Sequence, residues 1–346
     1  MFALVTIAMT VVTTFIALLA IDVYLHSKYQ RSAGFNVWGY RGPAVGRKQP
    51  GEYRVVMLGG SSAYGYGVTW DQAIPAQLEG DLQRVAPAGR SFRVVNLGYN
   101  NEGAYSFTFT LKDYTYLHYD LVCLYEGYND LMADERRPNV QVFRHDSPIF
   151  RLTGYLPIFP IVFKEKAAAM LSGGDPGALY RFEHKTVFRP GLAARAAATV
   201  LNATGDAGQA VERGLDRVAV ESPHRVGDTS GTGCRPPWGQ YCRAVVDAID
   251  LARANGHEVL FITQPYERID RPAYERHVDQ QREALAMIHR RYGHDPHVGT
   301  VDFGDAIDVR DTSLSFDLMH LTAEGNARLA SRLVQPVIAI ASEGRQ

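Results

Sequence analysis

Five short apolar runs, rich in valine and separated by segments with helical periodicity, constrain the fold of this 346-residue chain most strongly. Short and nearly continuous apolar runs are typical of strands that are buried on both faces of a sheet. The expected strands are 53–58, 92–97, 120–125, 257–263 and 298–303. Strands that alternate with helices form a parallel sheet covered on both faces, so we expect a three-layer α/β/α domain.

The segments between these runs predict the helices. An apolar stripe with helical spacing follows the first strand and consists of Ile74, Leu78, Leu82 and Val85. Asp71 is the expected N-terminal cap of this helix, and Pro75 is compatible with its first turn. Further helices are expected at 105–117, 240–255, 272–291 and 323–341, the last disturbed at Pro336.

The N-terminal segment from Phe2 to Ala20 contains no charged side chain. A helix of about 20 residues crosses the hydrocarbon core of a bilayer. A buried core helix would show a polar face, and a cleavable signal peptide would show a basic start and a small-residue cleavage site. Neither pattern is clear here, so we expect an uncleaved, single-pass membrane anchor over residues 1–25.

Two features indicate opposite sides of the membrane. Lys28 and Arg31 follow the span, which favours the cytoplasm under the positive-inside rule. Cys234 and Cys242 bracket a short loop that suits a disulfide in an oxidising compartment, whereas Cys123 lies in an apolar run like an ordinary buried thiol. We expect the main domain on the extracytoplasmic side and leave the cysteine pairing open.

Residues 26–52 contain several Gly and Pro residues and predict an extended linker that packs on a main domain at 53–341. Residues 132–235 interrupt the alternation of strands and helices. Structureless loops of that length are rare, so we expect a helical insertion over the carboxyl end of the sheet. Its apolar stretch at 155–163 could form a lid over a lipid site or an interior segment of the insertion.

The glycine-rich loop "GGSSAYGYG" at 59–67 does not match two phosphate-binding patterns. A P-loop requires a lysine, and none lies between Arg54 and Lys112. A dinucleotide-binding loop requires a third glycine at the position of Trp70. The net charge of −1 offers no basic surface, so no nucleic-acid partner is expected.

Acyl chemistry fits the same loop. Ser61 follows a strand that we expect in the centre of the sheet, where α/β domains place their ligands. A serine nucleophile needs a base, a group that orients the base, and donors for the oxyanion. Asp317 and His320 stand three residues apart, so one turn brings the carboxylate beneath the imidazole. Alone, this pair would also fit a capping aspartate and a surface histidine.

Two further segments offer oxyanion donors at the ends of strands. Asn129 in "GYND" is a neutral side-chain donor, although Gly, Asn and Asp also form ordinary turns. The segment "NLGYNNEG" at 96–103 is rich in Gly and Asn, and its backbone N–H groups would face the same crevice.

In this order, the four segments resemble the sequence blocks of the SGNH hydrolases, also called the GDSL esterase/lipase superfamily. "LGGSSAYG" resembles the first block, with Ser61 rather than Ser62 at the position of the nucleophile. "GYND" is similar to the third block and implies Asn129 as an oxyanion donor. "DLMH" is similar to the fifth block and implies Asp317 and His320 as the rest of a catalytic triad.

The resemblance covers most of residues 53–131 and 257–341 and implies a flavodoxin-like SGNH fold with no metal or organic cofactor. This chain departs from the family pattern at two positions. The usual Asp before the serine is Gly60 here. In the second block, an ungapped comparison places Asn101 at the oxyanion glycine and local similarity places Gly103 there; we take Gly103, with Ser61 and Asn129, as the oxyanion hole.

The family resemblance implies a serine acyl or O-acetyl esterase acting on a small-molecule, glycan or lipid ester. The membrane anchor and the expected export indicate acylated carbohydrate or lipid at the cell surface as the substrate. An O-acyltransferase with the same triad and a non-catalytic binding protein on this fold are the alternatives. Five tyrosines near the blocks could stack on sugar rings or serve as packing residues: Tyr64, Tyr66, Tyr99, Tyr105 and Tyr128. A metal site is a further alternative without tight ligand spacing, from His289, His294 and His297.

Overall fold

The computed structural model describes residues 2–29, 34–131, 138–171, 191–216, 231–266 and 272–343. The chain divides into two compact units. The smaller unit lies within residues 1–29, 37–39 and 147–222, and the larger unit lies within 30–36, 40–146 and 223–346.

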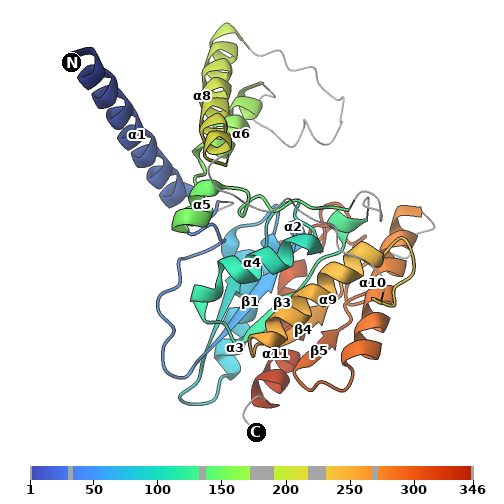
Figure 1. The fold of residues 1–346 in the computed structure, drawn as a ribbon. Coiled ribbons are helices and arrows are strands. Elements are labelled where there is room, and N and C mark those ends of the chain that lie inside the picture. The colour runs from blue at the N-terminus through green and yellow to red at the C-terminus, as the bar shows by residue number, and fades with distance from the viewer. Residues whose placement is uncertain are drawn as a thin grey trace. The chain divides into compact units, whose positions relative to one another are not determined.

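The larger unit is built on a five-stranded parallel sheet in the order β2–β1–β3–β4–β5 (Figure 1). The strands are β1 (Glu52–Leu58), β2 (Ser91–Asn96), β3 (Leu121–Leu124), β4 (Glu258–Ile262) and β5 (Val298–Val301). Each apolar run identified in the sequence forms one of these strands. The predicted α/β fold with a central parallel sheet is therefore confirmed.

Helices cover both faces of this sheet (Figure 1). On one face, α3 (Ile74–Val85) and α11 (Ala323–Glu343) pack together against a core that includes Val55, Met57 and Cys123. The other face carries α4 (Phe107–Asp113), α9 (Gly239–Ala254) and α10 (Pro272–Tyr292). Short elements lie between them: α2 (Ser61–Tyr64), η1 (Trp70–Gln72), η2 (Ala104–Ser106), η3 (Thr115–Leu117) and η4 (Tyr128–Asp130).

Three predicted details of the helices are wrong. Asp71 does not cap α3, because residues 70–72 form the separate turn η1 and Ala73 is the N-cap. Val85 has the spacing of the buried stripe but is exposed, since burial at a helix end also needs a packing partner there. Pro336 does not interrupt α11, which continues to Glu343.

The strand order places a topological switch point at the carboxyl ends of β1 and β3. The chain passes from β1 to β2 on one side and then crosses to β3 on the other. This switch point is where doubly wound sheets of this order bind ligands. Leu58 pairs with Leu124 at the end of the ladder, so the loops that follow the two strands start side by side.

The smaller unit is helical. It contains α1 (Phe2–Tyr29), α5 (Pro148–Thr153), α6 (Phe159–Leu171) and α8 (Leu192–Asp216). Gly205 and Gly208 allow α8 to approach Pro160 and Phe159 of α6 closely. The described part of the predicted insertion is thus largely helical; its residues 132–137, 172–190 and 217–230 lie outside the described residues.

A buried carboxylate joins α1 to the start of α6. Asp22 accepts the backbone N–H groups of Ile158 at 2.9 Å and Phe159 at 2.5 Å, and it also accepts the Tyr155 hydroxyl. The neighbouring His26 ring contacts the carbonyl of Leu156 at 2.8 Å. Leu156 and Ile158 are buried, which favours the interior interpretation of residues 155–163 over a lid.

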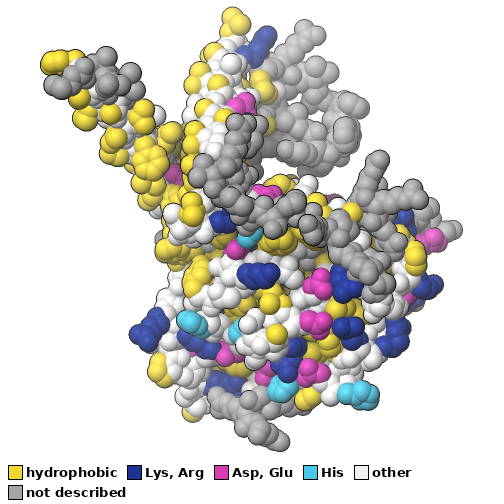
Figure 2. All heavy atoms as spheres, in the orientation of Figure 1, with side chains coloured by type: hydrophobic (Ala, Val, Ile, Leu, Met, Phe, Trp, Pro, Cys, Tyr) yellow, Lys and Arg dark blue, Asp and Glu magenta, His cyan; other side chains and the backbone are white. Residues whose placement is uncertain are grey.

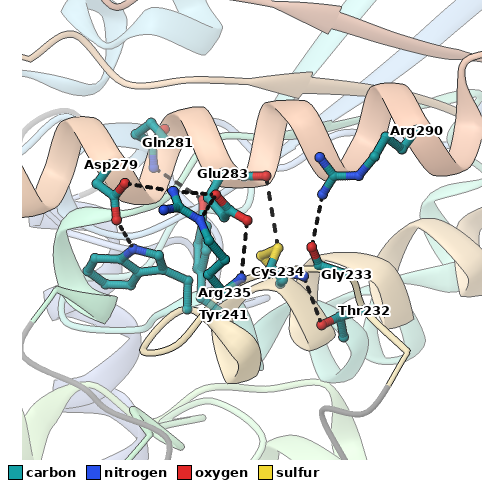
Figure 3. The surroundings of a disulfide bond; sticks show 11 residues. Thr232, Gly233, Cys234, Arg235, Tyr241, Asp279, Gln281, Glu283 and Arg290 are labelled. Atoms are coloured by element: carbon teal, nitrogen blue, oxygen red, sulfur yellow. Dashed lines mark hydrogen bonds and ion pairs between the residues drawn. A yellow bond between two sulfur atoms is a disulfide. The ribbon is translucent and has the colours of Figure 1, made fainter.

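Cys234 and Cys242 form a disulfide (Figure 3). Cys123 is a buried free thiol. The disulfide loop is docked on α10. Its Arg235 binds the carboxylates of Glu283 and Asp279 at 2.9 and 3.2 Å (Figure 3). These contacts fix the loop at the start of α9.

Candidate active site

The loop after β1 is tight and presents Ser61 at the start of α2. A Cβ atom on Gly59 would lie less than 3.0 Å from the carbonyl oxygen of Tyr125, so only glycine lets the two loops approach this closely. The N–H groups in the first turn of a helix have no partner within the helix. The Ser61 N–H therefore has no partner within α2, as an oxyanion donor requires.

Two side chains hold the far end of α2. Arg41 is buried, and its guanidinium donates hydrogen bonds to the carbonyl oxygens of Tyr64, Gly65 and Val68. Asn96 Nδ2 donates to the Tyr64 carbonyl at 3.2 Å. Arg41 belongs to the predicted linker, so this part of the linker packs on the domain and supports the nucleophile loop.

The serine, histidine and aspartate form a continuous hydrogen-bonded chain. His320 Nε2 lies 2.8 Å from Ser61 Oγ, and His320 Nδ1 lies 2.8 Å from Asp317 Oδ2. The carboxylate contact favours the proton on Nδ1, which leaves Nε2 free to accept the serine hydroxyl. The other carboxylate oxygen of Asp317 accepts the His320 N–H at 2.8 Å.

Asp317 is ionised in this arrangement. Burial alone would raise the pKa of its carboxyl, but the side chain and backbone N–H of His320 outweigh burial and lower the pKa below its ordinary value. An ionised carboxylate can orient the imidazole and stabilise the imidazolium that forms during general-base catalysis.

Asn129 lies beside the nucleophile loop, at the end of β3. Its Nδ2 donates one hydrogen bond to the carbonyl oxygen of Glu102 at 2.9 Å. A primary amide has two N–H donors, so the second remains for a ligand. Asn129 also packs directly against Gly60, where a Cβ atom would lie less than 3.0 Å from Nδ2.

The geometry favours Asn101 over Gly103 as the third backbone donor. In a trans peptide the C=O and N–H point in opposite directions. The Glu102 carbonyl faces Asn129 Nδ2, so the Gly103 N–H of the same peptide points away from that amide. Asn101 has φ 66°, in the left-handed region that glycine favours, and it occupies the family's glycine position in the ungapped comparison.

No family model and no curated protein matches this chain. Similar solved structures include a protein assigned to the lipolytic G-D-S-L family from Desulfitobacterium hafniense DCB-2, 11% identical over 82% of this chain and 98% of its own, with a TM-score of 0.42. An acetylxylan esterase from Geobacillus stearothermophilus is 13% identical, and the match covers 84% of this chain and 96% of the esterase, with a TM-score of 0.43. An α/β hydrolase from the metagenome of Lake Arreo, Spain, is 12% identical, and the match covers 85% of this chain and 99% of the hydrolase, with a TM-score of 0.45. Ester hydrolases are therefore among the solved structures that are similar to this chain.

Two buried carboxylates that follow β3 were not identified from the sequence. Glu126 is 1% exposed and accepts the N–H groups of Gly60, Gly127 and Asn129. Asp130 accepts the Ala104 N–H at 2.9 Å. The sequence feature that could have identified Glu126 is an acidic residue at the end of the apolar run "LVCLYEG", because a charge buried at a strand end needs hydrogen-bond partners.

Burial raises the pKa of both carboxyls. For Glu126 the pKa is raised to about 7, although its N–H partners and the nearby His320 oppose the shift. For Asp130 the charge of Glu126 adds to the effect of burial. Perturbed carboxyl groups of this kind concentrate at functional sites.

Most of the five tyrosines are packing residues. Tyr64, Tyr99 and Tyr128 are buried, whereas Tyr66 is 48% exposed and its ring lies 4.8 Å from the ring of His320. Phe316, which the sequence analysis did not single out, is 53% exposed and lies against Gly67. Two accessible aromatic rings therefore stand beside the histidine.

The three histidines considered for a metal site do not gather into one. His289 Nε2 contacts Thr300 Oγ1 at 2.9 Å, and His297 lies 4.0 Å from Glu258. Within the part of the chain that the structure describes, no group of three or more His, Cys, Asp or Glu residues could hold a metal ion.

Proposed function

We propose that this chain is a serine ester hydrolase of the SGNH type, with Ser61 as nucleophile, His320 as base and Asp317 as the group that orients the base. The observation that carries the proposal is the unbroken chain of two 2.8 Å contacts from Asp317 through His320 to Ser61. Its position at the switch point of the sheet supports the same conclusion.

The reaction proceeds in two steps. Ser61 Oγ attacks the ester carbonyl while His320 Nε2 takes the hydroxyl proton, and the carbonyl oxygen becomes an oxyanion. Collapse of this intermediate breaks the ester C–O bond, and the leaving alcohol receives the proton from His320. Water then attacks the acyl-serine by the same route, which releases the acid and restores Ser61.

The oxyanion is held by the Ser61 N–H, by Asn129 Nδ2 and by a third backbone N–H, for which we take Asn101 in place of Gly103 because the Gly103 N–H points away from Asn129 Nδ2. Such donors act on charge that develops only in the transition state, so they raise kcat rather than binding of the ester. Removal of one donor costs about 10²–10³ in kcat. Asn129→Ala is therefore expected to be strongly impaired and still measurably active.

The alcohol side of the substrate is a sugar ring in this proposal. Tyr66 and Phe316 present two exposed aromatic faces beside His320, and such faces stack on the apolar side of a ring. An acyl ester of a cell-surface carbohydrate fits this arrangement.

We further propose that α1 is a retained membrane anchor. Residues Ala8–Lys28 form a candidate span with a mean hydropathy of 2.0, and apolar side chains cover α1 (Figure 2). The Asp22 cluster supports retention, because cleavage after α1 would leave the start of α6 without its capping carboxylate. The disulfide supports an oxidising, extracytoplasmic location for the main domain.

Hydrolysis of p-nitrophenyl acetate and labelling by a fluorophosphonate test the proposal on the detergent-solubilised full chain. Wild type should hydrolyse and label, and Ser61→Ala should do neither. Ser62→Ala is the matched control and should behave like wild type, because the adjacent hydroxyl takes no part. A folded wild type without label or turnover would refute the enzyme and favour a binding protein. Transfer of acetyl to an added sugar would instead indicate an acyltransferase.

A further inference from the structure

A carboxylate lies beneath the two loops that form the oxyanion hole. Glu126 follows β3, and its side chain reaches back to both loops. One oxygen accepts the N–H groups of Gly127 at 2.8 Å and Asn129 at 3.0 Å, and the other accepts the Gly60 N–H. A single buried side chain thereby connects the loop after β1 with the loop after β3.

This contact explains why the chain needs no acidic residue at position 60, where the family resemblance places an Asp before the nucleophile. A Cβ atom on residue 60 would lie less than 3.0 Å from Glu126 Oε2 and from Asn129 Nδ2. No side chain fits at position 60, and the space beside it is filled by a carboxylate that comes from position 126.

We propose that Glu126 is a positioning residue that fixes the oxyanion hole by holding the main chain at Gly60 and Asn129. The inference rests on the proposed function, because it assigns a role in the same reaction. The Gly60 peptide precedes the Ser61 N–H, and the Asn129 main chain carries the amide donor. When both are held by one carboxylate, the two donors keep a constant separation.

The surroundings of Glu126 are consistent with this role. Its backbone carbonyl accepts hydrogen bonds from the Tyr241 hydroxyl at 2.7 Å and from Gln281 Nε2 at 3.2 Å. Side chains of α9 and α10 therefore fix the backbone of Glu126. Among the described residues, the titratable groups that interact with it are Tyr125, Asp130, Tyr241 and His320. Its three N–H partners all favour the ionised form, which has only acceptors to offer them.

The test compares Glu126→Gln with wild type in the full chain. Gln keeps the shape of the side chain, but its NH₂ group faces an N–H donor, so one loop is released. We expect kcat on p-nitrophenyl acetate to fall about 10²-fold, as for a catalytic group displaced by about 1 Å. KM should stay within about twofold, because the lost alignment acts in the transition state.

A second substitution separates positioning from general damage. If Glu126 aligns Asn129 with the Ser61 N–H, Glu126→Gln should lower kcat by a smaller factor in an Asn129→Ala background than in wild type, since residues that share one function are not additive. Glu126→Asp keeps the charge on a shorter side chain and should restore part of kcat. Glu79→Gln is the matched control: Glu79 accepts the Val94 N–H at 2.8 Å outside the site and should leave kcat unchanged.

The outcomes distinguish this inference from the proposed function. An active wild type with an equally active Glu126→Gln variant overturns the inference and leaves the proposed function intact. Independent, multiplicative losses with Asn129→Ala also overturn it. A wild type that neither labels nor turns over overturns both. If Glu126→Gln fails to fold, Glu126→Asp and its combination with Asn129→Ala give the same comparison.

Discussion

Gly60 and the side chain of Asn129 fit together only because residue 60 has no Cβ atom, which would lie less than 3.0 Å from Asn129 Nδ2. We therefore expect Gly60→Ala to displace the amide and lower kcat on p-nitrophenyl acetate by about 10²–10³, the cost of one oxyanion donor. The φ of residue 60 is −86°, outside the left-handed region that favours glycine, and circular dichroism with thermal melting checks that the variant folds.

Gly80→Ala is the control for this prediction. A Cβ atom at position 80 would meet nothing within 4 Å, and the residue lies inside α3. This variant should keep the wild-type kcat and gain about 0.5–1 kcal/mol of stability, because alanine favours helices over glycine. Wild-type turnover in Gly60→Ala would show that Asn129 does not act from its observed position.

Arg41 supports the nucleophile loop from the linker. Arg41→Met keeps the apolar stem but leaves three carbonyl oxygens without their charged donor. We expect the free energy of unfolding, measured by urea denaturation in detergent, to fall by at least about 2 kcal/mol. Arg47→Met, at an exposed position in the same linker, should change it by less than about 0.5 kcal/mol. Equal stability of the two variants would contradict the supporting role.

Tyr66 and Phe316 should select the alcohol part of the substrate. Tyr66→Ala and Phe316→Ala are each expected to raise KM for an O-acetylated oligosaccharide about 3- to 10-fold, the value of one stacking contact. Neither should change kcat/KM for p-nitrophenyl acetate by more than about threefold. Tyr116→Ala, at an exposed aromatic position outside the site, is the control. Parallel losses on both esters would argue against a sugar subsite.

Glu126 should give stability a distinctive pH dependence. Its pKa is raised from 4.5 to about 7 in the folded chain, so folding favours the protonated form. Its contribution to stability is therefore fully present below about pH 4.5 and is lost as pH rises towards 7. The Glu126→Gln variant has no titrating group at this position, so its stability does not change with pH for this reason.

The wild-type free energy of unfolding minus that of Glu126→Gln should accordingly decrease between pH 4.5 and 7. The slope is at most about 1.4 kcal/mol per pH unit for one proton. Urea denaturation across this range measures the difference, and titrating groups that do not interact with Glu126 cancel in it. A difference that is constant with pH would show that Glu126 titrates normally.

The Cys234–Cys242 disulfide should be present in protein purified without reductant. Thiol titration of the unfolded, unreduced chain should find one thiol, from Cys123, and reduction should raise the count to three. Cys234→Ser is expected to lower the free energy of unfolding by about 2–3 kcal/mol, as for a short closed loop. Three thiols before reduction would place the domain in a reducing compartment.

Features that depend on neighbours along the chain could be predicted from the sequence. The continuous apolar runs predicted buried parallel strands, and the apolar stripes predicted helices, because burial leaves a local periodicity. The spacing of Asp317 and His320 predicted their contact, because one turn of chain brings them together. The predictions at Asp71 and Val85 were wrong because capping and burial at a helix end depend on what packs there.

Only the tertiary structure decided which distant segments meet. Ser61 and His320 are 259 positions apart, and their contact follows from the sheet order, which no local pattern encodes. The same order places Glu126 under Gly60, so the acidic side chain missing at position 60 comes from the neighbouring strand. A buried carboxylate takes its role from the N–H groups that the fold directs towards it, and those groups become its neighbours only when the chain has folded.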